Sequence, residues 1–204
     1  PFLERKNLLA VPWRERLFIA EGQVDVFGIS SGTTDAGKPL ITPRSPDFIE
    51  AFVKHTAPPE LLARLEVTKV MLLLPPFSGL QRQALVAPLP GVRVILGDAK
   101  NMGASALAAA ELGVEGFITT PTGLERLIES YESAGFDLSV VKWVSLGAEG
   151  MSKAKYAYLR GKLPRARFGI RFGAAEFAAS RFYRCDFLDA EPDLFHPIPD
   201  SHLF

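Results

Sequence analysis

Short, continuously apolar runs alternate with helical patterns along most of the chain, and this alternation constrains the fold more than any other feature. Most of the runs are apolar on both faces, which is typical of parallel strands covered on both sides and not of a sheet with one wet face. The pattern therefore predicts an α/β fold with a mostly parallel sheet and helices on both faces. The runs that we interpret as strands are 23–30, 67–75, 92–98, 114–120, 141–147 and 166–173.

The segments between these runs carry helical patterns with clear end signals. Ser45, Asn101 and Ser152 can accept hydrogen bonds from the first backbone amides of the helices that follow them. Gly113 and Gly135 suit the left-handed residue that closes a helix. Strand, helix, strand units of this kind imply right-handed crossovers, so a ligand belongs at the carboxyl ends of the strands. The expected helices are 45–57, 80–89, 101–113, 122–135 and 152–163.

Composition narrows the class of protein. The chain has 204 residues, of which 48% are hydrophobic, enough for one domain with a substantial core. Lysine and arginine (23) balance aspartate and glutamate (23), which gives no support to a nucleic-acid-binding surface. The only cysteine, Cys185, has no disulfide partner in the chain, so we expect a reducing, cytoplasmic setting. The apolar stretches fall far short of the roughly 20 residues of a membrane span, so we expect no membrane insertion.

The segment "SSGTTDAGKP" (30–39) indicates a phosphate site. Gly32, Gly37 and Lys38 fit the spacing of a P-loop, but Pro39 stands where a magnesium-binding hydroxyl is required. The prolines from Pro39 onward also forbid the helix that should follow. We therefore favour a loop of hydroxyls, glycines and one cation between two extended segments, which can wrap the β- and γ-phosphates of a nucleotide. A polar surface turn and a P-loop-like phosphotransferase remain weaker alternatives.

Several stretches, in order along the chain, resemble landmarks of the adenylate-forming superfamily, which includes acyl- and aryl-CoA ligases, peptide synthetase adenylation domains and luciferases. "SSGTTDAGKP" resembles its "[ST]-S-G-T-T-G-x-P-K" signature, and "VSLGAEGMS" (144–152) resembles its "GGEPLS" turn. "IRFGAAEF" (170–177) resembles "NxYGxTE", and "LLLPPFSGL" (72–80) lies where the acyl-pocket helix begins. The segment from 182 to 204 is similar to the phenylacetate-CoA ligase-like branch.

This resemblance, which spans about residues 24–204, implies the domain organisation and the reaction. It implies one AMP-binding core over 1–204, made of a lead-in (1–22), an α/β core (23–177) and an antiparallel β appendix (178–204). The chain would be the N-terminal part of a longer protein that supplies the mobile catalytic domain. With ATP and Mg²⁺, it would activate a small carboxylic acid, aromatic or otherwise, as an acyl adenylate. The acceptor stays open between coenzyme A, a carrier-protein thiol and an amine, as does the choice between monomer and homodimer.

The resemblance also assigns roles to individual residues. It makes Lys38 and Glu176 catalytic and gives Glu176 the Mg²⁺ ion, a hard cation that prefers carboxylate oxygen. Phe172 would lie on the adenine. Residues 147–149 would line the base and acyl pocket, and residues 31–38 would hold the phosphates. The full set of expected nucleotide-binding residues is Ser31, Gly32, Thr33, Thr34, Gly37, Gly147, Ala148, Glu149, Phe172, Gly173, Ala174 and Ala175.

Some positions depart from the family pattern. Asp35 brings a negative charge to the phosphate loop, and Gly37 replaces a proline. Ala175 replaces a threonine whose hydroxyl contacts the α-phosphate in the family, a loss of roughly 0.5–1.5 kcal/mol. These departures keep a second interpretation open, in which the chain is a catalytically degenerate nucleotide-binding or interaction module of the same fold.

Overall fold

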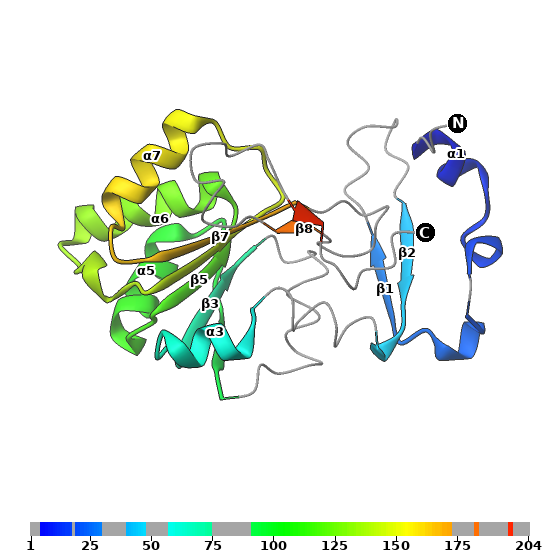
Figure 1. Cartoon of the computed structure of the whole chain (residues 1–204), viewed down its shortest axis with the longest axis horizontal. Helices are drawn as coiled ribbons and strands as arrows, with labels where there is room; N and C mark the ends of the chain where they lie inside the picture. The colour runs from blue at the N-terminus through cyan, green and yellow to red at the C-terminus, as the bar shows by residue number, and fades with distance from the viewer. Residues whose placement is uncertain are drawn as a thin grey trace.

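The computed structural model describes residues 5–17, 19–29, 40–47, 57–74, 91–172, 182–183 and 196–197, and within them the main element is a seven-stranded sheet of order β4-β3-β5-β6-β7-β8-β9. Its parallel part consists of β3 (Lys69–Leu73), β4 (Arg93–Leu96), β5 (Gly116–Thr119), β6 (Trp143–Leu146) and β7 (Arg167–Phe172). Each of these strands lies inside a predicted apolar run. The predicted α/β fold with a mostly parallel sheet is confirmed (Figure 1).

Two short strands extend the sheet beyond β7. β8 (Phe182–Tyr183) pairs antiparallel with β7, and β9 (His196–Pro197) pairs antiparallel with β8. Both lie in the segment predicted as an antiparallel β appendix. β7 therefore pairs with a parallel strand, β6, on one side and with an antiparallel strand, β8, on the other.

One predicted strand lies outside the main sheet. β1 (Val26–Ile29) pairs antiparallel with β2 (Ile41–Arg44) in a separate two-stranded sheet. An antiparallel pair needs no crossover helix, which fits the extended reading of both segments that flank residues 30–39. The residues before β1 pack against this pair, because Trp13 meets Phe27 edge-on at 5.0 Å and the Arg16 guanidinium donates to the Ile41 carbonyl at 3.2 Å.

The helices largely follow the sequence signals. α5 (Met102–Leu112), α6 (Pro121–Ala134) and α7 (Lys153–Lys162) lie in predicted helical segments. Within the predicted helix 45–57, the structure describes residues 45–47 and 57, and of these residues 46 and 47 are helical. The predicted helix 80–89 lies outside the described residues. The unpredicted elements are α1 (Arg5–Ala10), α3 (Pro59–Arg64) and the 3-10 helices η1 (Trp13–Arg16), η2 (Glu21–Gln23) and η3 (Leu138–Val140). No described helix is long and apolar enough to cross a bilayer.

The predicted caps of α5 and α7 are present, whereas the predicted cap at Ser45 stays a prediction. The Asn101 side chain accepts a hydrogen bond from the Ala104 amide, and the Ser152 hydroxyl accepts one from the Lys155 amide, both at 3.2 Å. Gly113 and Gly135 close α5 and α6 in the left-handed conformation, with φ of 63° and 70°. These local signals explain why α5 and α7 begin, and α5 and α6 end, where the sequence predicts them to.

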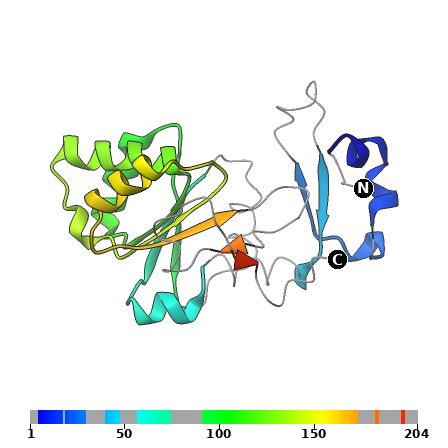
Figure 2. The ribbon, with the colours of Figure 1, turned by 45° about the horizontal axis from the view of Figure 1, so that its top comes forward.

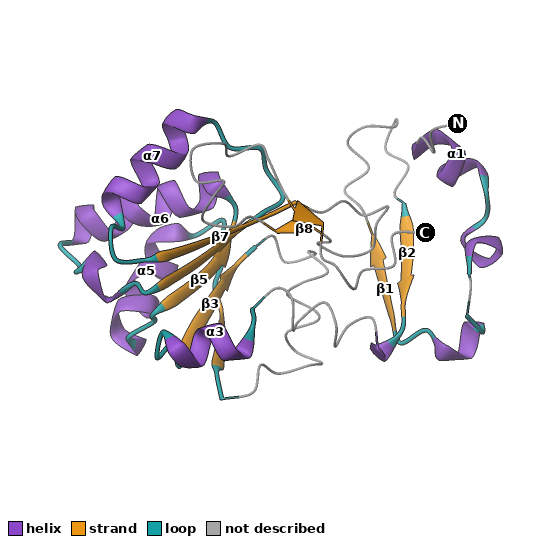
Figure 3. Cartoon of the chain, in the orientation of Figure 1, coloured by secondary structure: helices purple, strands orange, loops and turns teal. Residues whose placement is uncertain are grey.

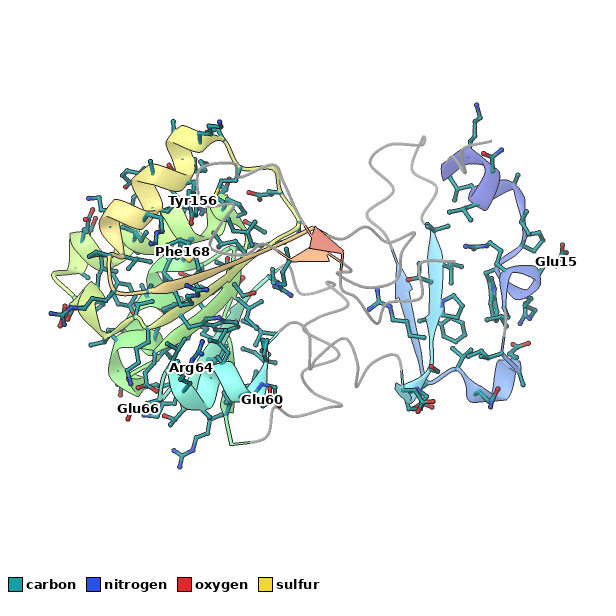
Figure 4. All side chains as sticks on the ribbon, in the orientation of Figure 1. Glu15, Glu60, Arg64, Glu66, Tyr156 and Phe168 are labelled. Atoms are coloured by element: carbon teal, nitrogen blue, oxygen red, sulfur yellow. The ribbon has the colours of Figure 1, made fainter. Side chains whose placement is uncertain are left out.

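The sheet is buried on both faces, and alternate strand residues serve opposite layers. Figures 2 and 3 show α5, α6 and α7 on one face and α3 on the other. On the first face, Phe117 and Val144 pack among side chains of the three helices, and Tyr156 of α7 meets Phe168 of β7 edge-on at 5.9 Å (Figure 4). On the second face, Trp143 belongs to a cluster with the α3 residue Leu62. This two-sided burial is the reason why the strands are continuously apolar in sequence.

Candidate functional site

The carboxyl ends of the parallel strands meet at one edge of the sheet, and the turn after β6 lies there. The Gly147 amide donates a hydrogen bond to the Thr119 carbonyl at the end of β5, at 3.2 Å. On the other side, a Cβ at Gly147 would lie 3.4 Å from the backbone oxygen of Arg171 in β7. Gly147 thus sits between the ends of two neighbouring strands, and a Cβ there would make only ordinary contacts with described atoms.

The next residue of the turn has a strained backbone. Ala148 has φ of 67°, in the left-handed region that costs a residue with a Cβ about 1–2 kcal/mol. The only other described residue with a side chain and a positive φ is Glu66 (φ 53°), at the end of α3 (Figure 4). Glu66 lies at the opposite, amino-terminal edge, since its carbonyl accepts from the ammonium of Lys142, directly before β6. A residue with a side chain and a positive φ thus occurs at both edges, and at the carboxyl edge it falls within the predicted turn 147–149.

Glu149 connects this turn to a helix. Its carboxylate accepts a hydrogen bond from the Thr122 amide, in the first turn of α6, at 3.1 Å. A carboxylate at a helix N-terminus satisfies a free amide and opposes the helix dipole. Glu149 therefore helps to hold the turn against α6, and its predicted part in lining the base and acyl pocket stays a prediction.

Arg171, the neighbour of Gly147 on β7, is a feature that the sequence analysis missed. Its Nε is enclosed and, in the part of the chain that the structure describes, makes no hydrogen bond. Burial lowers the pKa of Arg171 to about 10. The guanidinium remains charged at neutral pH, so a positive charge lies beside the turn without a described acceptor. The signal in the sequence was an arginine as the penultimate residue of a strand whose only other charged residue is Arg167 at its start.

The structure brings together part of the predicted site. Residues 147–149 form one turn, and Phe172 ends β7 next to Arg171, so their backbones share the carboxyl edge. Ile29 and Ile41 are cross-strand partners, so the segment between them begins and ends at one place in the β1–β2 pair. The remaining predicted residues lie outside the described ones: Ser31, Gly32, Thr33, Thr34, Gly37, Lys38, Gly173, Ala174, Ala175 and Glu176. Within the described ranges, no cluster of His, Cys, Asp and Glu could hold a metal ion.

Comparison with known proteins gives the fold a context. No protein-family model and no curated protein matches the chain. An open conformation of 2-hydroxyisobutyryl-CoA ligase with 2-HIB-AMP and CoA matches with a TM-score of 0.69 at 11% identity, over 90% of this chain and 45% of that chain. VinN in complex with L-aspartate matches with a TM-score of 0.67 at 17% identity, over 90% of this chain and 46% of that chain. The anthranilate CoA ligase AuaEII in complex with anthranoyl-AMP matches with a TM-score of 0.59 at 18% identity, over 80% of this chain and 32% of that chain.

These similarities concern the fold. The chain spans less than half the length of each of these enzymes, and the identities are low. The chain has the fold of the N-terminal core of adenylate-forming enzymes, as the sequence resemblance predicted. Which branch of the superfamily it is closest to stays a prediction.

Proposed function

We propose that this chain is the nucleotide-holding core of an ATP- and Mg²⁺-dependent enzyme that activates a carboxylic acid as an acyl adenylate. One observation carries the proposal. The stretches "VSLGAEGMS" and "IRFGAAEF" resemble neighbouring motifs of adenylate-forming enzymes, and the fold places the ends of their strands, β6 and β7, side by side at the carboxyl edge. Similarity to CoA ligases and a peptide synthetase supports the same reaction class.

In this reaction a carboxylate oxygen attacks the α-phosphorus of ATP, the bond to pyrophosphate breaks, and an acyl–AMP anhydride forms. The acyl group then passes to a thiol of coenzyme A or a carrier protein, or to an amine. The protein must hold the two reactants in line and offset the charge on the leaving pyrophosphate. We assign the second task to Ser31, Thr33, Thr34 and Lys38, whose hydroxyls and ammonium can donate to phosphate oxygens.

The described residues fit an anionic, flat ligand. At Gly147 and Ala148 the turn presents backbone and at most one methyl group, so a base can approach closely. The guanidinium of Arg171 beside the turn suits negative charge. Mg²⁺, when bound, would neutralise phosphate charge, and Glu176 would hold it. We further propose that the chain is one AMP-binding core of a longer cytoplasmic protein, with an acid substrate of small size.

Pyrophosphate exchange tests the proposal. The full-length parent protein is incubated with ATP, labelled pyrophosphate and a panel of aromatic and aliphatic acids, and we expect exchange that depends on one class of acid. Glu176→Ala should abolish Mg²⁺-dependent exchange without unfolding the protein. Glu129→Ala, which removes an exposed carboxylate of α6, is the matched control and should leave exchange unchanged. Undiminished exchange in Glu176→Ala would refute the metal role.

The alternative function is a degenerate module that binds a nucleotide but activates nothing. Ala175 and Asp35 favour it, because one lacks a phosphate-binding hydroxyl and the other adds a repulsive charge. The same assay separates the two functions. ATP binding by calorimetry without exchange for any acid would support the degenerate module.

A further inference from the structure

Arg171 is half-buried, and its Nε is fully enclosed without a hydrogen-bond partner among the described residues. An enclosed donor without an acceptor is unfavourable, and a guanidinium pairs best with a carboxylate or phosphate. The side chain belongs to the end of the last parallel strand, where ligands of this fold class bind. An anion from outside the chain would satisfy it.

On the side of β6, the sheet beside Arg171 is built from small residues, whereas its cross-strand partner on β8 is Tyr183. Cross-strand register puts Gly169 opposite Ser145, on the same face as Arg171, and Gly147 follows Ser145 on that face beside Arg171. A Cβ at Gly169 would meet, among described atoms, only the Val144 oxygen at 3.7 Å and the Ser145 hydroxyl at 3.8 Å, both ordinary contact distances. Packing against described residues therefore does not require glycine here.

Elsewhere this face carries large side chains, such as Trp143 and Ile118. Along β6 this face changes from Trp143 through Ser145 to Gly147 toward the carboxyl edge, next to the guanidinium. We infer that a ligand group lies against Gly147 and Gly169, which are partly exposed, beside the positive charge of Arg171.

We propose that Arg171 binds a second carboxylate of the acid substrate, so that the enzyme activates dicarboxylic acids. This inference rests on the proposed function, since it concerns the acid at the same site. The carboxylate that reacts loses its charge when it becomes an anhydride, so a guanidinium placed on it would favour the ground state over the transition state. A second carboxylate keeps its charge throughout, and a fixed cation can hold it during the whole reaction.

The first test uses matched pairs of acids on the full-length parent protein. Succinate, glutarate and phthalate are compared with their monoamides in ATP–pyrophosphate exchange. We expect a diacid to exceed its monoamide in kcat/KM by about 10- to 100-fold, the worth of a hydrogen-bonded charge pair. Arg171→Met should remove this preference by raising KM of the diacid to about that of its monoamide. Arg171→Lys should retain part of the preference.

The second test measures binding without turnover. Because Arg171→Met removes an unpaired enclosed charge, the ligand-free variant should melt at a higher temperature than the parent. The diacid should raise the Tm of the parent, and it should leave the Tm of Arg171→Met unchanged. Arg167→Met is the control: Arg167 lies on the same strand and face but at the amino-terminal end, so the response to the diacid should persist.

The outcomes separate the two proposals. If the parent activates an acid with no preference for a diacid over its monoamide, or if Arg171→Met leaves the diacid rate unchanged, adenylation stands and the dicarboxylate inference falls. If Arg171→Met raises KM for ATP equally with every acid, the guanidinium serves the nucleotide phosphates and the inference again falls. If no acid supports exchange but a diacid raises Tm in an Arg171-dependent way, the proposed adenylation fails and the dicarboxylate site is supported.

Discussion

Replacing Ala148 by glycine should stabilise the protein, and the size of the stabilisation follows from the backbone conformation of Ala148. At φ of 67° a residue with a Cβ bears about 1–2 kcal/mol of strain, which glycine removes. Glycine also gains freedom in the unfolded chain, which costs roughly 0.5–1 kcal/mol. The difference is a net stabilisation of about 0.5–1 kcal/mol, equivalent to a rise in Tm of about 1–4 °C for a domain of this size.

The assay is thermal unfolding of the full-length parent and the variant, with Glu66→Gly as the matched control. Glu66 has φ of 53° and lies at the amino-terminal edge, so it should give a similar rise in Tm. Pyrophosphate exchange then separates the two sites. Ala148→Gly should change KM for the acid or for ATP, whereas Glu66→Gly should not. A lower Tm for Ala148→Gly beside a higher Tm for Glu66→Gly would show that the turn after β6 is not strained.

Two further predictions concern the core and the amino-terminal edge. The hydroxyl of Tyr131 is buried near Phe117 with no hydrogen-bond partner among the described residues, and burial raises the pKa of Tyr131 to about 12. Tyr131→Phe should therefore raise the free energy of unfolding in urea by about 1 kcal/mol. Although burial raises the pKa of Glu115, hydrogen bonds from Lys142 (2.6 Å) and from the Thr68 amide and hydroxyl (2.8 and 2.9 Å) hold it below its ordinary value. This carboxylate stabilises the fold above its unfolded pKa of about 4.3, and that stability is lost as pH falls through the lower folded pKa. Because the Lys142 side chain is 37% exposed, we expect Glu115→Gln to cost only about 1 kcal/mol at pH 7, measured as a shift in the urea midpoint that vanishes at pH 2.

The sequence predicted the elements whose signals are local. The run 67–75 is apolar at every position that β3 buries, and Asn101 and Ser152 cap α5 and α7 as their side chains suggested. α3 was missed because it is a single short helix behind Pro58 and Pro59, residues that more often mark a turn. Proline fits the first helical position, however, because the amide it lacks would have no helical partner there.

The site was less predictable than the fold. The sequence identified the turn 147–149, but neither the strained φ of Ala148 nor the contact of Glu149 with α6 has a local signature. The sequence shows Arg171 only as a charge in an apolar strand. Its meaning depends on enclosure by other parts of the chain, which is a property of the packed fold. Features of this kind arise from tertiary contacts, and residue patterns alone do not reveal them.

The two edges of the parallel sheet differ in how well their polar groups are satisfied, and this difference locates the site independently of any motif. At the amino-terminal edge Glu115 binds three donors, and Lys142 also donates to the Glu66 carbonyl. At the carboxyl edge the Nε of Arg171 has no described hydrogen-bond partner, although both edges carry one residue with a positive φ, Glu66 and Ala148. Unfavourable features persist where function requires them. Arg171→Met should therefore gain stability and lose diacid binding, and Ala148→Gly should gain stability and change KM. Glu115→Gln should lose stability and retain diacid binding. If Ala148→Gly and Arg171→Met both raised Tm and left exchange and diacid binding intact, the carboxyl edge would not be the binding site.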